Sequence, residues 1–376
     1  MSIREIHRAT LQSWLSQGGP GRGEELAVLD LRDEAAYGKG HPLFATNLPL
    51  RRLHEAVERF VPRKSVRTVL VDDGNGDAAK GAEVLAGLGY TNVNVLAGGI
   101  PAWLEGGING LPTFDIPGVI FAVGIENQRG TPAITVAALQ QLCETDADVV
   151  VLDTRTVEEF EQFHVPRARS LPGAEIIQRF VDYVPSPESF VVVSCAGLPR
   201  AIIGAQSLID AGVPNRVAYL VDGTTAWTKA GFALESGRRD EFGPISQAAA
   251  GFAAEHIERL ATRAGVATID RAGVADWLED KSRTTYLLDV RLAHEFAAQH
   301  LPGSISAPGG QLLAVSHRTV AVRGARLVLI DDTGVRATTT AYWLKQRDWE
   351  VRVYAGALDA AREQDAAPVR RVLEPV

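Results

Sequence analysis

The chain has 376 residues, 46% of them hydrophobic and 22% charged, with a formal net charge of −8 at pH 7. Its length indicates two or three domains rather than one. The acidic balance argues against a nucleic-acid partner, which needs a basic face. No apolar run approaches the ~20 residues that cross a bilayer, and the N-terminus lacks the apolar core of a signal peptide. We therefore expect a cytoplasmic protein with neither nucleic acid nor membrane as a partner.

Each of three segments begins with a pattern of apolar residues that fits one buried helix face. The members of these three sets are Ile6, Leu11, Trp14 and Leu15, then Ile134, Leu139, Leu142 and Cys143, and then Ile269, Val274, Trp277 and Leu278. Thr135 and Asp270 precede the second and third of these helices and are predicted to cap them. Because Cys143 occupies the register of Leu15 and Leu278, we expect it to be a core residue.

A short apolar strand ending in Asp-x-Arg follows each helix. The three pairs are Asp30 and Arg32, Asp153 and Arg155, and Asp289 and Arg291. A histidine stands 11 residues after each Asp, at His41, His164 and His300. A second apolar strand ends 42 residues after each Asp, at Asp72, Cys195 and Asp331. Two spacings held in three copies indicate an internal repeat.

Another helix and a third strand complete each copy. Helices that alternate with buried strands predict an α/β fold in which each unit is a mainly parallel sheet flanked by helices on both faces. We place the units at residues 1–112, 130–237 and 265–376. The first connection is rich in Pro and Gly, and the second contains a predicted helix between Ala248 and Ala264.

The order and spacing of these motifs resemble the rhodanese family of sulfurtransferases. The resemblance is carried by Asp-x-Arg, the Glu159-Phe160 pair, His164-Val-Pro, the strand that ends in Cys195, and the closing Gly223…Ala226-Trp227. It covers nearly the whole chain three times and implies three tandem rhodanese-like domains. The loop after Cys195 departs from the common sulfurtransferase pattern in two ways. The glycine of that pattern stands three residues after the cysteine, whereas Gly197 stands two after it, and Pro199 has no N–H to donate.

The loop that follows the middle strand reads Cys195-Ala196-Gly197-Leu198-Pro199-Arg200, after which a helix begins. Backbone N–H groups and the helix dipole converge at such a turn and stabilise an anion there. We expect this field to lower the thiol pKa of Cys195 and so favour the nucleophilic thiolate. Ala196, Gly197 and Leu198 would line the substrate cradle, and Arg200 would hold an anionic substrate.

Four further residues are predicted to support the middle site. Asp153 and Arg155 recur in units without a nucleophile, so we expect a structural ion pair. For His164 we favour a structural hydrogen bond over a general-base role. Trp227 matches Trp103 of the first unit and is predicted to pack beside the loop.

The outer units carry Asp72 and Asp331 in the register of Cys195 and are predicted to be inactive, because a carboxylate cannot form a persulfide. Asp331 is expected to satisfy its own loop donors and to pair with Arg336. Asp72, Asp73 and Asp77 raise the alternative of a hard-cation site, but no fuller ligand set is visible. We therefore predict no metal and no cofactor.

The resemblance implies that Cys195 takes a sulfane sulfur from a small anionic donor such as thiosulfate. It would then pass this sulfur to cyanide, a thiol or a protein acceptor. A non-catalytic sulfur carrier or redox-sensing scaffold is the alternative. A phosphatase or arsenate reductase is less favoured, because four residues separate Cys195 from Arg200 and the related phosphatases have five. The sequence leaves open the physiological donor and acceptor, the role of the outer units and a homodimeric state.

Overall fold

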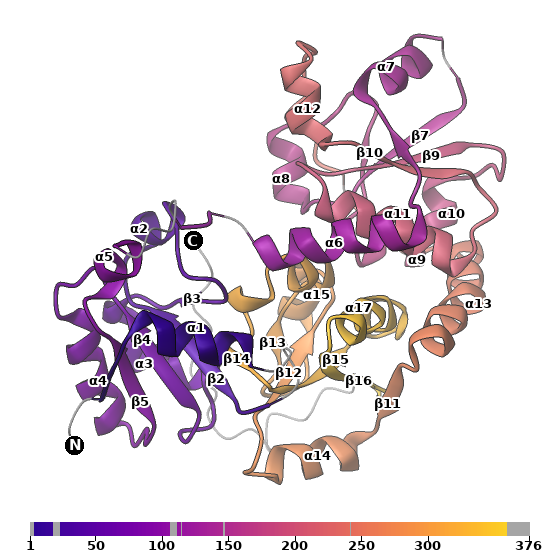
Figure 1. The fold of residues 1–376 in the computed structure, drawn as a ribbon. Coiled ribbons are helices and arrows are strands. Elements are labelled where there is room, and N and C mark those ends of the chain that lie inside the picture. The colour runs from indigo at the N-terminus through magenta and orange to yellow at the C-terminus, as the bar shows by residue number, and fades with distance from the viewer. Residues whose placement is uncertain are drawn as a thin grey trace.

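The chain folds into three α/β units, each built on its own sheet, as the repeat predicts (Figure 1). This computed structural model describes residues 4–17, 23–105, 111–113, 115–145, 147–240 and 242–358. The end of the predicted third unit, residues 359–376, lies outside the described residues. The third unit lies between the other two in the view of Figure 1.

The elements of the three units follow a common order with local differences. The first unit contains β1 (Arg4–Ile6), α1 (Arg8–Ser16), β2 (Leu26–Asp30), α2 (Glu34–Gly38), β3 (Thr46–Asn47), α3 (Leu50–Phe60), β4 (Arg67–Val71), α4 (Asp77–Gly87), β5 (Val93–Leu96) and α5 (Gly99–Leu104). The middle unit contains β6 (Ala133–Ile134), α7 (Val136–Glu144), β7 (Val149–Asp153), α8 (Val157–Gln162), β8 (Arg169–Ser170), α9 (Glu175–Gln178), α10 (Phe180–Tyr183), β9 (Phe190–Ser194), α11 (Pro199–Ala211), β10 (Val217–Leu220) and α12 (Gly223–Lys229). The third contains β11 (Ala267–Ile269), α14 (Arg271–Glu279), β12 (Thr285–Asp289), α15 (Ala293–Ala298), β13 (Ile305–Ser306), α16 (Gly309–Ala314), the 3-10 turn η1 (Ser316–Arg318), β14 (Val322–Arg323), β15 (Arg326–Ile330), α17 (Val335–Gln346) and β16 (Glu350–Tyr354). Two short helices thus replace α3 in the middle unit, and η1 and β14 are added before β15 in the third.

The middle sheet has the strand order β6-β10-β9-β7-β8, and all its pairings are parallel. Its central strands are continuous runs of valine that are buried by helices on both faces, as expected for a parallel sheet. Asp153 at the end of β7 is in register with Ser194 at the end of β9. The Asp-x-Arg loop and the Cys195 loop therefore leave the same edge of the sheet.

The predicted helix caps are present. The side chains of Thr135 and Asp270 accept hydrogen bonds from the amides of Ala138 and Gly273 at the starts of α7 and α14. In α8, Thr156 and Glu159 form a capping box. Glu159 is thereby fixed at the first turn of a helix that begins just after the Asp-x-Arg loop.

Both connections between units form helices. The second is α13 (Gln247–Ala264), close to the predicted range. The first, which is rich in Pro and Gly, forms α6 (Ile116–Arg129), which begins with a proline near its first position and ends at Gly130 in the left-handed conformation. Both signals fit a helix start and stop. In Figure 1, α6 runs between the middle and third units.

The first and third units share a sheet and a core, which the repeat alone did not predict. The strand β14 of the third unit pairs antiparallel with β2, so it extends the first sheet. One hydrophobic cluster contains residues of both units, among them Leu29 and Leu53 with Leu288 and Leu327. Buried Glu25 also accepts hydrogen bonds from the amide and the hydroxyl of Thr284, of 2.5 and 2.8 Å.

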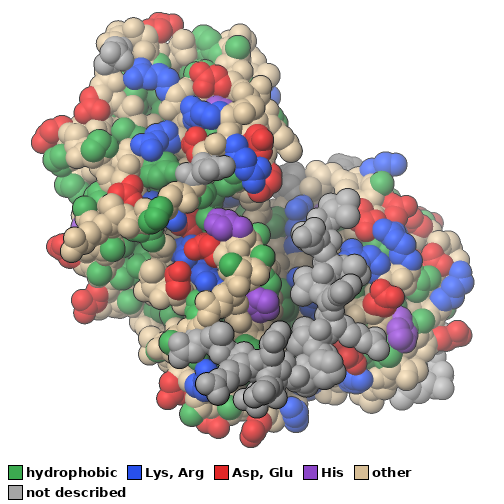
Figure 2. Space-filling model, turned by 180° about the vertical axis from the view of Figure 1, so that it is seen from behind, with side chains coloured by type: hydrophobic (Ala, Val, Ile, Leu, Met, Phe, Trp, Pro, Cys, Tyr) green, Lys and Arg blue, Asp and Glu red, His purple; other side chains and the backbone are tan. Residues whose placement is uncertain are grey.

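The surface carries charges of both signs. On the face shown in Figure 2, lysine and arginine side chains lie interspersed with aspartate and glutamate side chains among the described residues. Within those residues, no helix combines the length and the apolar character needed to span a bilayer.

Candidate active site

Cys195 follows β9 directly and precedes α11, which begins at Pro199. Because Pro199 occupies the first helical position, its missing N–H removes no helical hydrogen bond. The backbone amides of Gly197 and Ala201 lie near the Cys195 sulfur and favour its charged form. Two backbone donors thus converge on one sulfur at a helix N-terminus, which is an arrangement that stabilises negative charge.

The thiol of Cys195 is only 1% exposed. Burial raises its pKa above the ordinary value, whereas the Arg200 charge and the amides of Gly197 and Ala201 oppose the rise and Asp153 adds to it. The predicted lowering of this pKa is therefore wrong. The cost of burying a thiolate exceeds the stabilisation that these donors and the guanidinium provide.

Arg200 is held by a carboxylate of its own unit. Its Nη1 and Nη2 atoms donate to the two Glu159 oxygens at 2.6 and 2.8 Å. Burial disfavours the charged carboxylate, but the bonds from Arg200 lower the pKa of Glu159 to about 2. Sequence reasoning gave Glu159 no role. A signal was present in the spacing, because Glu159 precedes Arg200 by 41 residues and Glu295 precedes Arg336 by the same number. The first unit has neither the glutamate nor the arginine, since Ala36 and Asp77 stand at these positions.

The remaining cradle residues, Ala196, Gly197 and Leu198, are half-buried. The Ala196 carbonyl accepts hydrogen bonds from the Thr225 amide and hydroxyl at 3.1 and 2.7 Å. Leu198 packs against the core that also contains Cys195. Of the three residues, Gly197 therefore contributes the donor to the sulfur.

Gly223 lets α12 approach the loop closely. Its φ is +47°, and a Cβ built on it would lie 1.9 Å from the Cys195 carbonyl oxygen. The next residue, Thr224, donates its amide to the same oxygen at 3.0 Å. The closing motif thus fixes the backbone of Cys195, which sequence reasoning did not assign to it.

Asp153 and Arg155 form the predicted ion pair, with a distance of 2.8 Å between fully buried groups. Arg155 also donates to the Phe163 carbonyl. The same pairing occurs in the outer units, at 2.7 Å for both Asp30–Arg32 and Asp289–Arg291. The pair therefore anchors a loop in every unit, whether or not a cysteine is present.

His164 and Trp227 are buried structural residues. The His164 Nδ1 donates to the Phe160 carbonyl at 2.8 Å, and the two rings stack at 3.9 Å. His300 repeats this arrangement in the third unit, so the hydrogen bond favoured from the sequence is confirmed. The Trp227 indole donates to the Ala233 carbonyl at 3.0 Å and lies in the core against which Cys143 packs.

In the outer units a carboxylate fills the anion cradle. Asp72 accepts hydrogen bonds from the amides of Gly74 and Ala78, both at 2.9 Å. These donors stand two and six residues after Asp72, as Gly197 and Ala201 stand after Cys195. In the first unit, therefore, the Asp72 carboxylate occupies the position that the Cys195 sulfur holds in the middle unit.

Asp331 of the third unit accepts from the amides of Asp332 and Arg336 at 2.9 and 2.8 Å and pairs with the Arg336 Nε at 3.0 Å. This confirms the expected pairing. Burial raises the pKa of Asp331 to about 6, although Arg336 opposes the shift.

The alternative of a cation site in the first unit is not supported. Asp72 is occupied by amides, Asp73 lies 3.5 Å from Arg32, and Asp77 pairs with Lys80 at 2.9 Å. Among the described residues, no group of three or more His, Cys, Asp or Glu side chains is arranged to hold a metal ion.

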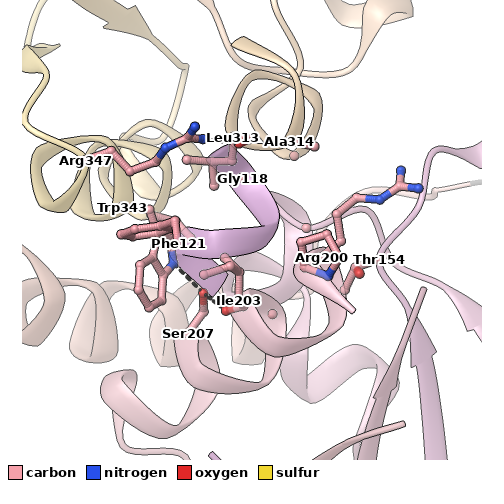
Figure 3. A pocket seen from close by; sticks show the side chains of 15 residues that line it. Gly118, Phe121, Thr154, Arg200, Ile203, Ser207, Leu313, Ala314, Trp343 and Arg347 are labelled. Atoms are coloured by element: carbon pink, nitrogen blue, oxygen red, sulfur yellow. Dashed lines mark hydrogen bonds between the residues drawn. The ribbon is translucent and has the colours of Figure 1, made fainter. Parts of the chain in front are cut away.

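A cavity beside the Cys195 loop lies between the middle and third units (Figure 3). The residues that line it include Phe121 of α6, Pro199, Arg200, Ile203 and Ser207 of α11, Leu313 of α16, and Trp343 and Arg347 of α17 and the turn after it. Figure 3 shows the Arg200 guanidinium directed away from the apolar group formed by Phe121, Ile203 and Trp343.

Comparisons with known proteins agree with the repeat. Residues 11–106, 135–230 and 272–364 each match the family model described as Rhodanese-like domain. The crystal structure of thiosulfate sulfurtransferase from Pseudomonas aeruginosa is similar to this chain, with 41% identity and a TM-score of 0.86, over 98% of this chain and 70% of that one. The provisionally assigned sulfur carrier protein YrkF of Bacillus subtilis (strain 168) is 27% identical over 103 residues. That match covers 27% of this chain, which spans about half (54%) of the relative's length.

Proposed function

The chain belongs to the rhodanese-like domain family, and we propose that it is a sulfurtransferase in which Cys195 of the middle unit carries the transferred sulfur. The observation that carries this proposal is the position of Cys195 directly after β9 and just before α11, where the nearby Gly197 and Ala201 amides favour a charged sulfur. The outer units place Asp72 and Asp331 at that position, and a carboxylate cannot accept a sulfane sulfur.

The proposed reaction has two displacements. The Cys195 thiolate attacks the outer sulfur of a donor such as thiosulfate, a new S–S bond forms, and sulfite leaves with the electron pair of the broken S–S bond. Cyanide or a thiolate then attacks the outer sulfur of the persulfide, and the Cys195 thiolate leaves. The Cys195 sulfur carries negative charge before the first displacement and after the second, and the Gly197 and Ala201 amides stabilise that charge.

Arg200, paired with Glu159, also stabilises negative charge on the Cys195 sulfur. Its charge acts on the Cys195 sulfur while its guanidinium stays bonded to the carboxylate. Arg200 therefore supports the anionic sulfur through its charge, and the pair with Glu159 fixes where that charge lies.

A turnover assay with thiosulfate and cyanide tests the proposal, with Cys195→Ser as the control variant. We expect thiocyanate formation by the native protein and none by the variant. A single sulfur transfer to Cys195 without turnover would instead identify a sulfur carrier. Hydrolysis of a phosphate ester would overturn the assignment in favour of a phosphatase.

A further inference from the structure

The third unit contacts the middle unit through the residue that corresponds to Arg200. Arg336 is fully buried, and its Nη1 donates to Glu175 of α9 in the middle unit at 2.9 Å. Within the third unit it also pairs with Glu295, Asp331 and Asp332. A guanidinium at an anion-cradle position thus binds a carboxylate of another unit, while Asp331 fills the cradle itself.

Glu175 is itself almost completely buried, with its side chain 1% exposed. Its second oxygen accepts from the Arg179 Nε at 2.9 Å. A second bond crosses the same contact, because the Thr333 hydroxyl donates to the Gln178 side chain at 2.8 Å. Both ends of α9 are therefore held by the third unit, one by Thr333 in the loop after β15 and the other by Arg336 at the start of α17.

The segment fixed in this way is hydrogen-bonded to the Cys195 strand. Gly173 donates to the Thr154 carbonyl at 3.2 Å, and the Thr154 amide donates to the Ser194 carbonyl at 3.0 Å. Ile176 of α9 belongs to the same core as Cys195. A movement of α9 would therefore reach the residue before the nucleophile through two hydrogen bonds and shared packing.

The contact is reciprocal between the two units. Gln311 of α16 stands 22 residues after Asp289, as Glu175 stands 22 residues after Asp153. The Gln311 amide lies 3.5 Å from the Glu159 carboxylate that holds Arg200. A Cβ on Gly310 would lie 3.2 Å from the Gly173 nitrogen, so the two backbones pack closely. Glu175 of the middle unit thus contacts the Arg336–Glu295 pair of the third unit, and the equivalent residue Gln311 of the third unit contacts the Arg200–Glu159 pair of the middle unit.

We propose that the third unit positions the middle site. The hydrogen bonds from Arg336 and Thr333 to α9, here called the clamp, hold this helix in place and so keep the Cys195 thiol buried beside the Gly197 and Ala201 amides. The proposal adds a task for the inactive third unit to the proposed sulfur transfer. Arg336, Thr333 and Glu175 are positioning residues, because they act on Cys195 through the segment from Gly173 to Gln178.

The rate at which iodoacetamide alkylates Cys195 in the full chain tests the clamp without any sulfur donor. Tryptic peptides separate Cys195 from Cys143, and the half-buried Cys143 of α7 reports a wider loosening of the middle unit in the same sample. The test variant is Glu175→Gln, which keeps the shape but removes the charge between units. The matched control is Glu295→Gln, which removes a charge from the same Arg336 Nη1 within the third unit.

We expect Glu175→Gln to speed Cys195 alkylation about tenfold, equivalent to about 1.4 kcal/mol, with Cys143 unchanged, because residues of one buried network are energetically coupled. Glu295→Gln should change the Cys195 rate less than about twofold if the link between units is what matters. Equal effects of both variants would overturn the clamp, because the cause would then be the charge balance of Arg336.

A parallel rise at Cys143 would mean that Glu175→Gln loosens the whole middle unit. Thr333→Val then decides, because it keeps the side-chain shape and removes the hydroxyl that bonds to Gln178 of the middle unit, together with its contacts to Asp331 and the Val335 amide in the third unit. A faster reaction at Cys195 alone supports the clamp, and an unchanged rate in this variant contradicts it. Because alkylation needs no donor, a protein that fails to transfer sulfur but shows this pattern would overturn only the proposed function.

Discussion

Arg200 and Glu159 form a bidentate ion pair, with N–O distances of 2.6 and 2.8 Å, and the Arg200 charge acts on Cys195. The capping box at the start of α8 holds Glu159 in place, and the start of α11 holds Arg200. The charge that acts on Cys195 is thus positioned by two helices.

Glu159→Gln should destabilise the protein in a pH-dependent way. The pKa of Glu159 is lowered from 4.5 to about 2 in the folded protein, so its ion pair stabilises the fold above the unfolded value and this contribution is lost as pH falls toward about 2. The difference in unfolding free energy between native and variant protein should therefore shrink over that range in urea titrations. Glu34→Gln serves as the control, since the Glu34–Arg51 pair is exposed and should contribute little. A constant difference down to the acid end would contradict this assignment.

The reactivity of Cys195 should rise steeply with pH. Burial raises the pKa of the thiol, and only the thiolate reacts, so the raised pKa moves the rate profile to the alkaline side. We expect alkylation of Cys195 to increase about tenfold per pH unit between about pH 7 and about pH 9. Peptide mass spectrometry after timed alkylation measures this rate. A plateau near neutral pH would mean that the thiolate is stabilised after all.

Gly223→Ala should disrupt the Cys195 loop, because the added Cβ would meet the Cys195 carbonyl oxygen at 1.9 Å. Gly231→Ala is a matched control: Gly231 also has a positive φ, of +84°, but a Cβ added there would meet no atom within 4 Å. The control should lose about 1 kcal/mol of stability from backbone strain and keep its activity. Urea unfolding and the thiocyanate assay distinguish the two effects. Equal activity of both variants would show that the contact between α12 and the loop is dispensable.

Asp331→Cys should not create a second active site. Arg336 would lose one of its four carboxylate partners, at 3.0 Å, and the amides of Asp332 and Arg336 would lose a carboxylate acceptor, a change that costs about 1–3 kcal/mol. Asp331→Asn keeps an oxygen acceptor, so urea titrations should show a smaller loss of unfolding free energy for this variant than for Asp331→Cys. Mass spectrometry after exposure to a sulfur donor should find no sulfur on residue 331. A stable adduct there would show that the third unit has kept a competent cradle.

Much of the fold follows from sequence patterns that are local or repeated. The two fixed spacings locate three units, and the apolar runs of β7 and β9 predict buried parallel strands. The Asp153–Arg155 pair and the pairing of Asp331 with Arg336 also follow, because each joins residues within one motif or one loop.

The parts that sequence reasoning missed depend on contacts between distant segments. Neither Arg336–Glu175 nor the pairing of β14 with β2 leaves a periodic trace in the sequence, because each joins two different units. The sign of the Cys195 pKa shift was missed for a related reason. A loop motif predicts its own donors, whereas burial depends on everything that packs around it.

The most direct test of sulfur transfer is the mass of the tryptic peptide 180–200, which contains Cys195 as its one cysteine. After incubation with thiosulfate, mercaptopyruvate or a protein persulfide, we predict that this peptide gains one sulfur atom with at least one of the donors and loses it when cyanide is added. The gain should be absent in Cys195→Ser. An unchanged peptide with every donor, or sulfur transfer that persists in Cys195→Ser, would contradict the central role of this cysteine.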